Sequence, residues 1–200
     1  DKVSADVVGF EDEHVKIRFN QNMDMMAWIE NNGKLPLPPY ITAQRELKDE
    51  DKESYQTVYA EHAGSAAAPT AGLHFTEKLL HNIQAKGIRI CNVLLHVGSG
   101  TFSPIKTDNI LDHKIHSEWC HLDSQAANLL NQTRAAGGNI IAVGTTSMRI
   151  LESAVDGTGK FSEYKGETDI YIKPGHKFRA ADAMITNFHL PKSTLMMLVS

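Results

Sequence analysis

Cysteine and long apolar runs are both scarce in this sequence. Its 200 residues include only two cysteines, Cys91 and Cys120, so a disulfide framework is not expected and a reducing, cytoplasmic setting is the simplest interpretation. No apolar run reaches the roughly 20 residues that a membrane-spanning helix needs, and no basic segment followed by an apolar stretch opens the chain. We therefore expect no membrane partner and no export by a visible signal.

A surplus of positive charge is also missing. Lysine and arginine number 20 against 24 aspartates and glutamates, which gives a formal net charge of -4 at pH 7. A general basic coat for nucleic acid is therefore absent, and any contact with RNA must be local. Hydrophobic residues make up 42% of the chain and charged residues 22%, which is typical of a globular protein with one domain, or one domain and part of another.

The order of local patterns predicts three regions. Residues 1–20 hold two short β-branched segments separated by an acidic turn, which indicates a β-hairpin. Residues 21–48 contain a short helix over 23–30, for which Gly33 would supply a left-handed C-cap, and then a proline-rich extended connection. Residues 49–200 alternate between helix and strand patterns. Because the chain lacks an initial methionine and stops inside an apolar run, we expect it to be a piece of a longer protein.

The third region has the pattern of an α/β body. The N-cap candidates are Thr76 for one helix and Asp123 or Ser124 for the next, and Gly87 and Gly137-Gly138 stop these helices. We expect helices at 77–86, 124–136 and 146–155, and strands at 88–97, 139–143, 169–172 and 183–188. This alternation favours a parallel or mixed sheet. Because ligands in α/β folds bind where strands end, the small and polar residues at the strand exits are the functional candidates.

The first candidate segment, residues 64–76, is rich in small residues and runs into a helix start. Small side chains let a ligand approach the backbone closely, and a helix N-terminus favours an anion or a carboxylate. The alternative is a flexible loop in which Thr76 is an ordinary N-cap. The candidate binding residues are Pro69, Thr70, Ala71, Gly72 and His74.

The second candidate segment, residues 96–104, follows an apolar stretch. A dinucleotide fingerprint needs a third glycine and a helix that begins within the motif. Here Pro104 follows the Gly-x-Gly pair instead, so we do not expect a Rossmann site. His96 is either a catalytic base at the strand exit or a hydrogen-bonded rim residue. The candidate binding residues are Gly98, Gly100, Thr101 and Phe102.

The third candidate segment, residues 112–119, gathers titratable side chains. In an extended segment His116 and Glu118 point to the same face, where the carboxylate would orient the imidazole for acid–base chemistry. The alternative is a zinc site made of His113, His116 and Glu118. Neither an HExxH helix nor a cysteine cluster supports that alternative, so we expect no metal.

The fourth candidate segment, residues 143–152, combines a strand, a polar turn and a helix. Gly144, Thr145 and Thr146 begin a helix whose free amides and hydroxyls suit an anion or a nucleoside. Arg149 either forms an ordinary ion pair with Glu152, three residues further along, or holds a carboxylate.

The last candidate segments lie near the C-terminal end. Asn187, His189 and Lys192 surround an aromatic residue at a strand exit, which suits hydrogen bonding to a purine edge with stacking beside it. Just before them comes a short basic loop, which either holds RNA phosphates or is a solvated turn. Its basic residues are Lys173, His176, Lys177 and Arg179.

Taken in order, these segments resemble the S-adenosylmethionine:tRNA ribosyltransferase-isomerase family of queuosine biosynthesis. Strings typical of that family are matched at 36–41, 55–60, 68–76, 95–102, 113–118, 142–149 and 186–194. The resemblance implies an α/β catalytic domain of barrel-like architecture and a small antiparallel β-barrel. It assigns 1–20 to the C-terminal part of that β-barrel, 21–48 to the connection and 49–200 to a catalytic domain truncated at its C-terminus. An N-terminal Arg-Asp motif of the family is missing.

The reaction that the resemblance implies transfers and isomerises the ribosyl group of S-adenosylmethionine. The acceptor is 7-aminomethyl-7-deazaguanine at the wobble position of tRNA, the product is epoxyqueuosine, and adenine and methionine are released. S-adenosylmethionine is then a substrate, no metal or redox cofactor is implied, and we expect a cytoplasmic monomer. Because the sulfonium acidifies its neighbouring 5′-carbon, the chemistry needs a base there and an acid for the departing adenine.

Within that resemblance the residue roles are hypotheses. His116 with Glu118, or His96, supplies the base, and His189 or Asn187 contacts adenine. The loops at 70–74 and 144–149 hold methionine and ribose, and His113 belongs to the same substrate site. RNA contacts are assigned to Lys173, Lys177, Arg179 and Lys192. Two other classes stay open: a metal-dependent hydrolase, and a non-catalytic RNA-binding module, which the negative net charge disfavours.

Overall fold

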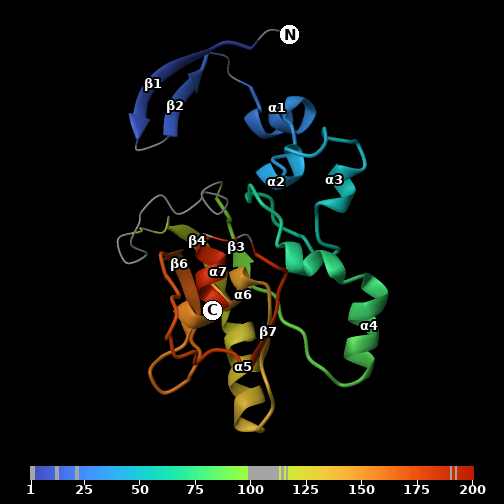
Figure 1. The fold of residues 1–200 in the computed structure, drawn as a ribbon, viewed down its shortest axis with the longest axis vertical. Helices are drawn as coiled ribbons and strands as arrows, with labels where there is room; N and C mark the ends of the chain where they lie inside the picture. Colours follow the sequence, from blue (N-terminus) through green and yellow to red (C-terminus); the bar gives the residue numbers. More distant parts are fainter. Residues whose placement is uncertain are drawn as a thin grey trace. The chain divides into compact units, whose positions relative to one another are not determined.

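The computed structural model describes residues 3–11, 14–20, 23–98, 113, 115, 117–189, 191 and 193–200. The chain divides into two compact units, Asp1–Leu35 and Pro36–Ser200, so the division falls inside the proline-rich connection. Helices and strands occur in both units, which makes this a mixed α/β protein (Figure 1). None of the helices in the described ranges combines the length and the apolar character needed to cross a lipid bilayer.

The first unit begins with the predicted hairpin, which is confirmed. Strand β1 (Ala5–Glu11) pairs antiparallel with β2 (His14–Phe19), with an irregularity in register between Val7 and Gly9. An isolated two-stranded ladder buries little surface. Its apolar side chains are accordingly exposed, and Phe10 reaches 79% exposure.

The helix of the first unit, α1 (Met25–Asn32), starts two residues later than predicted because Asp24 caps it. The Asp24 carboxylate accepts a hydrogen bond from the amide of Ala27 at 3.1 Å. At the other end the amide of Gly33 donates to the carbonyl of Ile29 at 2.6 Å. Gly33 is extended, with φ -70°, so the predicted left-handed C-cap is wrong.

The second unit contains the three helices that the caps predicted. The Thr76 hydroxyl accepts from the amide of Leu79 at 3.1 Å at the start of α4 (Glu77–Ala85), and the Asp123 carboxylate caps α5 (Ser124–Ala135) in the same way. The third predicted helix is α6 (Thr145–Ala154). The pattern did not predict α2 (Pro39–Thr42), α3 (Asp51–Ser54), the 3₁₀ turn η1 (Thr70–His74) or α7 (Thr194–Leu198).

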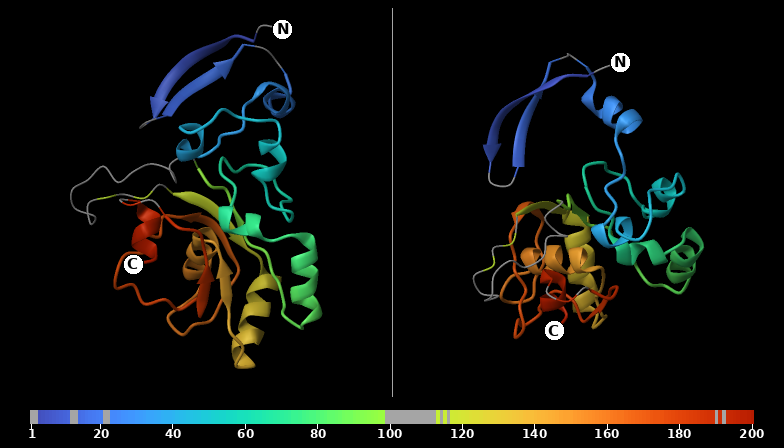
Figure 2. Two further views of the ribbon diagram at one scale, coloured as in Figure 1. Left: turned by 45° about the vertical axis from the view of Figure 1, so that its right-hand side comes forward. Right: turned by 45° about the horizontal axis from the view of Figure 1, so that its top comes forward.

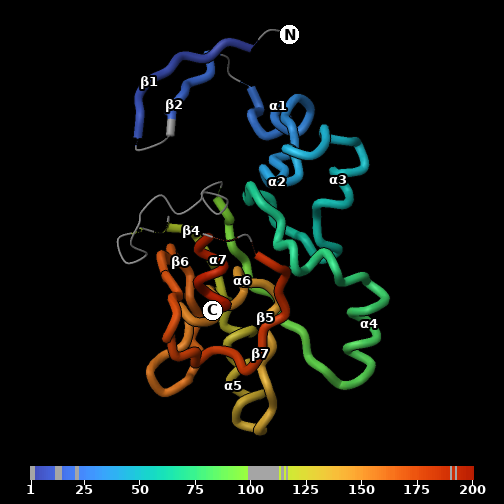
Figure 3. Tube along the Cα trace, viewed as in Figure 1, coloured from blue at the N-terminus to red at the C-terminus, as the bar shows by residue number. Residues whose placement is uncertain are grey.

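The strands of the second unit form two separate ladders. Strands β3 (Leu94–Leu95), β4 (Glu118–Leu122) and β6 (Tyr164–Thr168) pair antiparallel in the order β3-β4-β6. Strands β5 (Ile141–Val143) and β7 (Ala183–Ile185) pair parallel and lie side by side in the trace of Figure 3. The alternation of helix and strand therefore yields both strand directions.

Two strand predictions are wrong. Only Leu94–Leu95 of the predicted strand 88–97 belongs to a ladder; Ile88, with 54% exposure, lies outside it. Residues 169–172 lie outside the strands, whereas the preceding Tyr164–Thr168 forms β6. Ladder membership depends on a partner strand that is distant in sequence, and a local apolar pattern does not contain that information.

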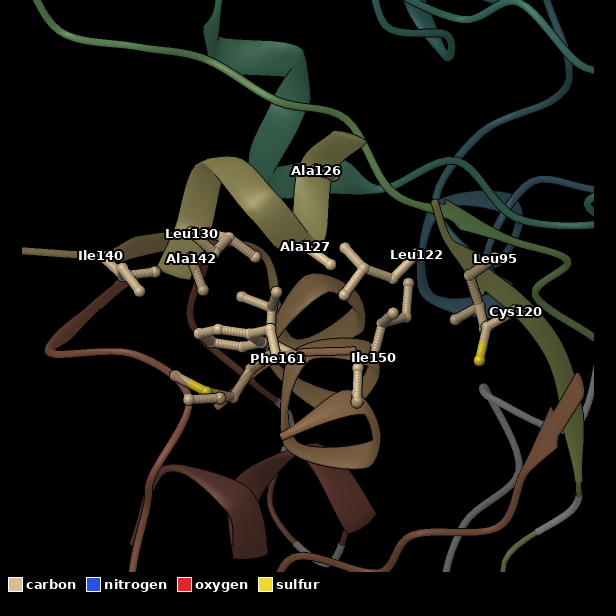
Figure 4. Close-up of a cluster of buried hydrophobic side chains, with 14 of the residues drawn as sticks. Leu95, Cys120, Leu122, Ala126, Ala127, Leu130, Ile140, Ala142, Ile150 and Phe161 are labelled. Carbon is tan, nitrogen blue, oxygen red and sulfur yellow. The ribbon is translucent and has the colours of Figure 1, made fainter. Parts of the chain in front are cut away.

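Helix α6 lies at the centre of the second unit. It contacts strands of both ladders, and the views in Figure 2 show it within the same body as the strands and α5. In Figure 4, Ile150 of α6 and Phe161 lie beside Ala127 and Leu130 of α5, while Leu95 and Cys120 extend the apolar cluster over the antiparallel ladder. Burial raises the pKa of the Cys120 thiol to about 11, so this cysteine is a neutral core residue.

Substitution of Ile150 tests this packing. The side chain is fully buried, so Ile150→Ala should lower the free energy of unfolding by about 2–5 kcal/mol through lost burial and the resulting cavity. Ile88→Ala removes the same atoms at an exposed position and should change it by less than about 0.5 kcal/mol. Urea denaturation of both variants measures the difference, and equal losses would contradict the assignment of the core around α6.

Candidate functional site

The first two candidate segments run side by side. The amide of Ala66 donates to the carbonyl of Val97 at 2.9 Å. The Ser65 hydroxyl donates to the carbonyl of Leu95 at 2.8 Å and accepts from the amide of Val97 at 3.1 Å. Segment 64–66 is therefore fixed along the exit of β3, although the two segments are 30 residues apart in the chain.

His96 is held by packing on two sides. Its ring centroid lies 5.1 Å from that of Trp119 on β4. On the other side, a Cβ atom placed on Gly64 would lie only 2.7 Å from the imidazole Cε1. Gly64 also has φ +137°, a conformation that favours glycine. The roles of catalytic base and rim residue both remain compatible with this half-buried ring.

The carboxylate of Glu118 connects three elements. One oxygen accepts a hydrogen bond from Nη1 of Arg149 on α6, and the other accepts from the amide of Gly98 at 3.1 Å. Glu118 is 6% exposed and Arg149 is 8% exposed, so this ion pair is buried. It joins the start of β4, the exit of β3 and the first turns of α6.

The alternative in which Arg149 pairs with Glu152 is wrong. Glu152 is also buried, but its carboxylate accepts from the amides of Arg179 and Ala180 at 2.8 and 2.7 Å and lies 3.0 Å from Nε2 of His176. Glu118, on β4, and Glu152, on α6 itself, thus contact different parts of the chain. Arg149 does hold a carboxylate, and that carboxylate belongs to Glu118.

A third set of contacts brings the glycine-rich, helix-start and C-terminal segments together. His74 Nε2 lies 2.8 Å from Asn187 Oδ1, across 113 residues of sequence. A Cβ atom placed on Gly144 would lie 3.8 Å from the Cβ of Ala71, and the Gly144 amide donates to the carbonyl of Ile185 at 2.8 Å. Together with the hydrogen bonds of Glu118 to Arg149 and Gly98, these contacts link the five candidate segments around the exits of β3, β5 and β7.

The start of α6 has open donors. Gly144 occupies the cap position with φ +92°, and no side chain caps the helix. Thr145 is buried, and the Ser147 hydroxyl donates to the carbonyl of Val143 at 2.8 Å rather than capping an amide. Unfilled amides at a helix N-terminus attract anions and carboxylates, so this end of α6 suits a negatively charged group.

The exit of β7 carries polar groups of a different kind. The Thr186 hydroxyl lies 3.2 Å from Nε2 of His189. Burial lowers the pKa of the His189 imidazole from its ordinary value of 6.5, so the ring is neutral near pH 7 and one of its nitrogens can accept a hydrogen bond. Between them, Phe188 is fully exposed.

The remaining predicted residues lie elsewhere or outside the described part. The His113 ring packs on Tyr171 at 5.8 Å between centroids, and Lys173 Nζ lies 5.2 Å from the same ring. This basic loop is anchored at Glu152, seven residues and about 10 Å along α6 from Thr145. The loop is therefore not part of the linked strand exits. Five predicted residues lie outside the described residues: Gly100, Thr101, Phe102, His116 and Lys192.

The zinc alternative gains no support from the described geometry. Both carboxylate oxygens of Glu118 already accept hydrogen bonds, and His113 packs on Tyr171. Among the residues that the structure describes, no three histidine, cysteine or acidic side chains are grouped so that they could hold a metal ion.

A family comparison decides the classification. A sequence model described as "Queuosine biosynthesis protein" matches residues 2–200. The chain belongs to the queuosine biosynthesis protein family. This agrees with the resemblance based on the seven sequence strings.

Known members of the queuosine biosynthesis protein family are close in sequence. The chain is 49% identical over 199 residues to an S-adenosylmethionine:tRNA ribosyltransferase-isomerase from Zymomonas mobilis, covering 99% of this chain and 58% of that protein. It is 50% identical over 200 residues to one from Clostridioides difficile, covering 100% and 58%. The chain thus spans well under two thirds of the length of these relatives.

A solved structure agrees with the sequence relatives. The crystal structure of an S-adenosylmethionine tRNA ribosyltransferase from Thermotoga maritima matches with a TM-score of 0.50 and 38% sequence identity. The match covers 64% of this chain and 39% of that one. It supports the mixed α/β fold for this member of the queuosine biosynthesis protein family.

Sequence reasoning missed Tyr59, which lies against one of the predicted binding residues. A Cβ atom placed on Gly72 would lie 2.0 Å from the Tyr59 hydroxyl oxygen and 2.9 Å from Cγ2 of Thr57. The φ of Gly72 is not in the left-handed region, so the glycine is explained by the space it leaves for these side chains. Where the backbone conformation of a turn does not require glycine, a glycine there is a sign that another side chain approaches closely.

The Glu118 ion pair can be tested by a double-mutant cycle. Glu118→Gln leaves the buried guanidinium without its counter-charge and should lower the free energy of unfolding by about 3–5 kcal/mol. Adding Arg149→Met removes that stranded charge, so the double variant should be more stable than Glu118→Gln alone. Glu163→Gln, which changes an exposed carboxylate 3.8 Å from the ring of His121, is the control and should cost less than about 1 kcal/mol. Strict additivity in chemical denaturation would mean that the pair is not coupled.

A second cycle tests the approach of Tyr59 to Gly72. Gly72→Ala introduces the 2.0 Å contact with the hydroxyl and should destabilise the protein by about 1–3 kcal/mol. Tyr59→Phe removes that oxygen, so it should rescue part of the loss in the double variant. Gly157→Ala, where an added Cβ meets nothing within 4 Å, is the matched control. Thermal melting that ranks Gly72→Ala with this control would refute the contact.

Proposed function

We propose that this chain is the catalytic part of an S-adenosylmethionine:tRNA ribosyltransferase-isomerase. The observation that carries the proposal is the linkage of the five candidate segments by Glu118–Arg149, Glu118–Gly98, His74–Asn187 and Gly144–Ile185. Such linkage gathers glycine-rich, hydroxyl-bearing and imidazole-bearing loops from distant parts of the sequence. Family membership and the names of the relatives supply the reaction class.

The proposed reaction moves the ribosyl group of S-adenosylmethionine onto 7-aminomethyl-7-deazaguanine in tRNA. The aminomethyl nitrogen bonds to the sugar, the sugar is rearranged to the epoxycyclopentanediol of epoxyqueuosine, and adenine and methionine leave. Removal of a proton beside the sulfonium needs a base, and departure of adenine needs an acid. Exclusion of water protects the intermediates from hydrolysis.

The geometry supports a division of these tasks. Because both oxygens of Glu118 accept hydrogen bonds from Arg149 and Gly98, we assign Glu118 to holding the strand exits together. Proton abstraction then falls to His116 or His96. The open amides at the start of α6 suit the methionyl carboxylate, and the neutral imidazole of His189 suits a hydrogen bond to adenine.

The proposal extends to the setting of the enzyme. S-adenosylmethionine is a substrate, and we propose that no metal or redox cofactor takes part. We further propose a cytoplasmic monomer that binds tRNA through a local basic surface, with Lys173, Lys177 and Arg179 contacting phosphates. The barrel-like closure of the catalytic domain, and a β-barrel to which β1 and β2 belong, also remain proposals.

The test is release of adenine by the full-length protein. Incubation with S-adenosylmethionine and tRNA carrying the 7-aminomethyl-7-deazaguanine should yield free adenine, and tRNA lacking that base should not. His116→Ala should lower turnover by at least about a hundredfold and leave the affinity for S-adenosylmethionine near normal. His81→Ala, at an exposed histidine on α4, is the control.

Several outcomes would contradict the proposal. tRNA binding without adenine release would favour an RNA-binding module. Loss of activity on chelation, with stoichiometric zinc in the purified protein, would favour a metal-dependent hydrolase. Turnover of His116→Ala within a few-fold of the parent would remove His116 from the role of base and leave His96.

A further inference from the structure

Phe188 is an apolar side chain that the described part of the chain leaves uncovered. Its relative exposure is 107%, compared with 79% for Phe10 in the hairpin and 43% for Phe178. Because the ring stays in contact with water in the free protein, it contributes no hydrophobic stabilisation to the fold. Single exposed hydrophobic residues are common, so exposure alone assigns no role to Phe188, and its surroundings must decide.

The backbone that carries Phe188 is anchored on both sides. Asn187 Oδ1 lies 2.8 Å from His74 Nε2, and the Thr186 hydroxyl lies 3.2 Å from His189 Nε2. One step earlier, the carbonyl of Ile185 accepts from the amide of Gly144 at 2.8 Å, at the end of the β5–β7 ladder. The ring is therefore presented to solvent from a fixed base beside the linked strand exits.

The residues directly before and after Phe188 in the chain are polar. Asn187 offers an amide that suits a nucleobase edge, whereas we assign the imidazole of His189 to adenine of the donor. Proteins that recognise unpaired RNA bases combine an aromatic face for stacking with side chains of this kind for the base edge. A protein-docking patch would instead need apolar neighbours around the ring.

We infer that Phe188 is a stacking surface for an unpaired base of the tRNA acceptor. This inference rests on the proposed function and adds the residue that contacts the acceptor at the strand exits. Because the ring projects into solvent, a ligand that covers it must lie on the protein surface. A polynucleotide can bind in that way. The donor nucleoside needs enclosure from water instead, which a fully exposed ring does not supply.

The experiment measures RNA binding apart from turnover. Affinity of the full-length protein for an anticodon stem-loop is measured by fluorescence anisotropy for Phe188→Ala, Phe188→Leu and Phe188→Trp. Loss of one stacked base should weaken binding about tenfold in both the Ala and Leu variants. Trp keeps an aromatic face, so Phe188→Trp should bind within about twofold of the parent, and its added fluorescence should be quenched by RNA. Phe10→Ala, an exposed phenylalanine in the hairpin, is the control and should bind normally.

Four results would overturn the inference. Normal binding by both Phe188→Ala and Phe188→Leu would remove the contact, and normal binding by Phe188→Leu alone would mean apolar packing without stacking. A raised KM for S-adenosylmethionine with unchanged RNA affinity would place adenine on the ring. A buried-indole emission of Phe188→Trp without RNA would mean that protein covers the position. RNA binding and adenine release are measured separately. If RNA binding depends on the aromatic ring and no adenine is released, the proposed activity is wrong and the Phe188 contact stands.

Discussion

The buried ion pair between Glu118 and Arg149 is the constraint on which the candidate site depends. Removing two charges from water costs several kcal/mol per ion in real proteins, and only a close partner offsets that cost. Burial of the Arg149 guanidinium therefore requires that the start of β4 lie beside α6. Burial of the second oxygen of Glu118 is compensated by the amide of Gly98. Nε and Nη2 of Arg149 have no hydrogen-bond partner within the described ranges, so the guanidinium depends on Glu118 for the compensation visible there.

Helix α6 connects this constraint to a second one. Glu152, also buried, holds the amides of Arg179 and Ala180 and the ring of His176. One helix thus orients two separate surfaces. Its first turn offers open amides next to the linked strand exits, and its last turns fix a loop that carries the basic side chains. The apolar core around Ile150 and Phe161 keeps the helix in place between them.

Local chemistry determined which features could be predicted from the sequence. Helices α4 and α5 followed from cap residues and terminal glycines, because those signals act within four residues. Strand 88–97 was overpredicted because pairing depends on distant partners. The partner of Arg149 was missed for the same reason: the i,i+3 spacing offered Glu152, whereas the fold brings Glu118, 31 residues away in sequence, against the guanidinium. The candidate segments were named from the sequence, but their mutual contacts, including His74 with Asn187, required the fold.

The parallel β5–β7 ladder sets the alignment of the two loops that follow it. Val143 pairs with Ile185, so Gly144 and Thr186 begin their loops from matched positions, and Asn187 follows one residue later. A strand advances about 3.3 Å per residue and alternates its faces. Deletion of one residue within β7 would therefore both retract Asn187 from His74 and reverse which side chains face inward. Length changes in the exposed turn at residues 156–160 leave that alignment intact, so natural variation in chain length should concentrate there.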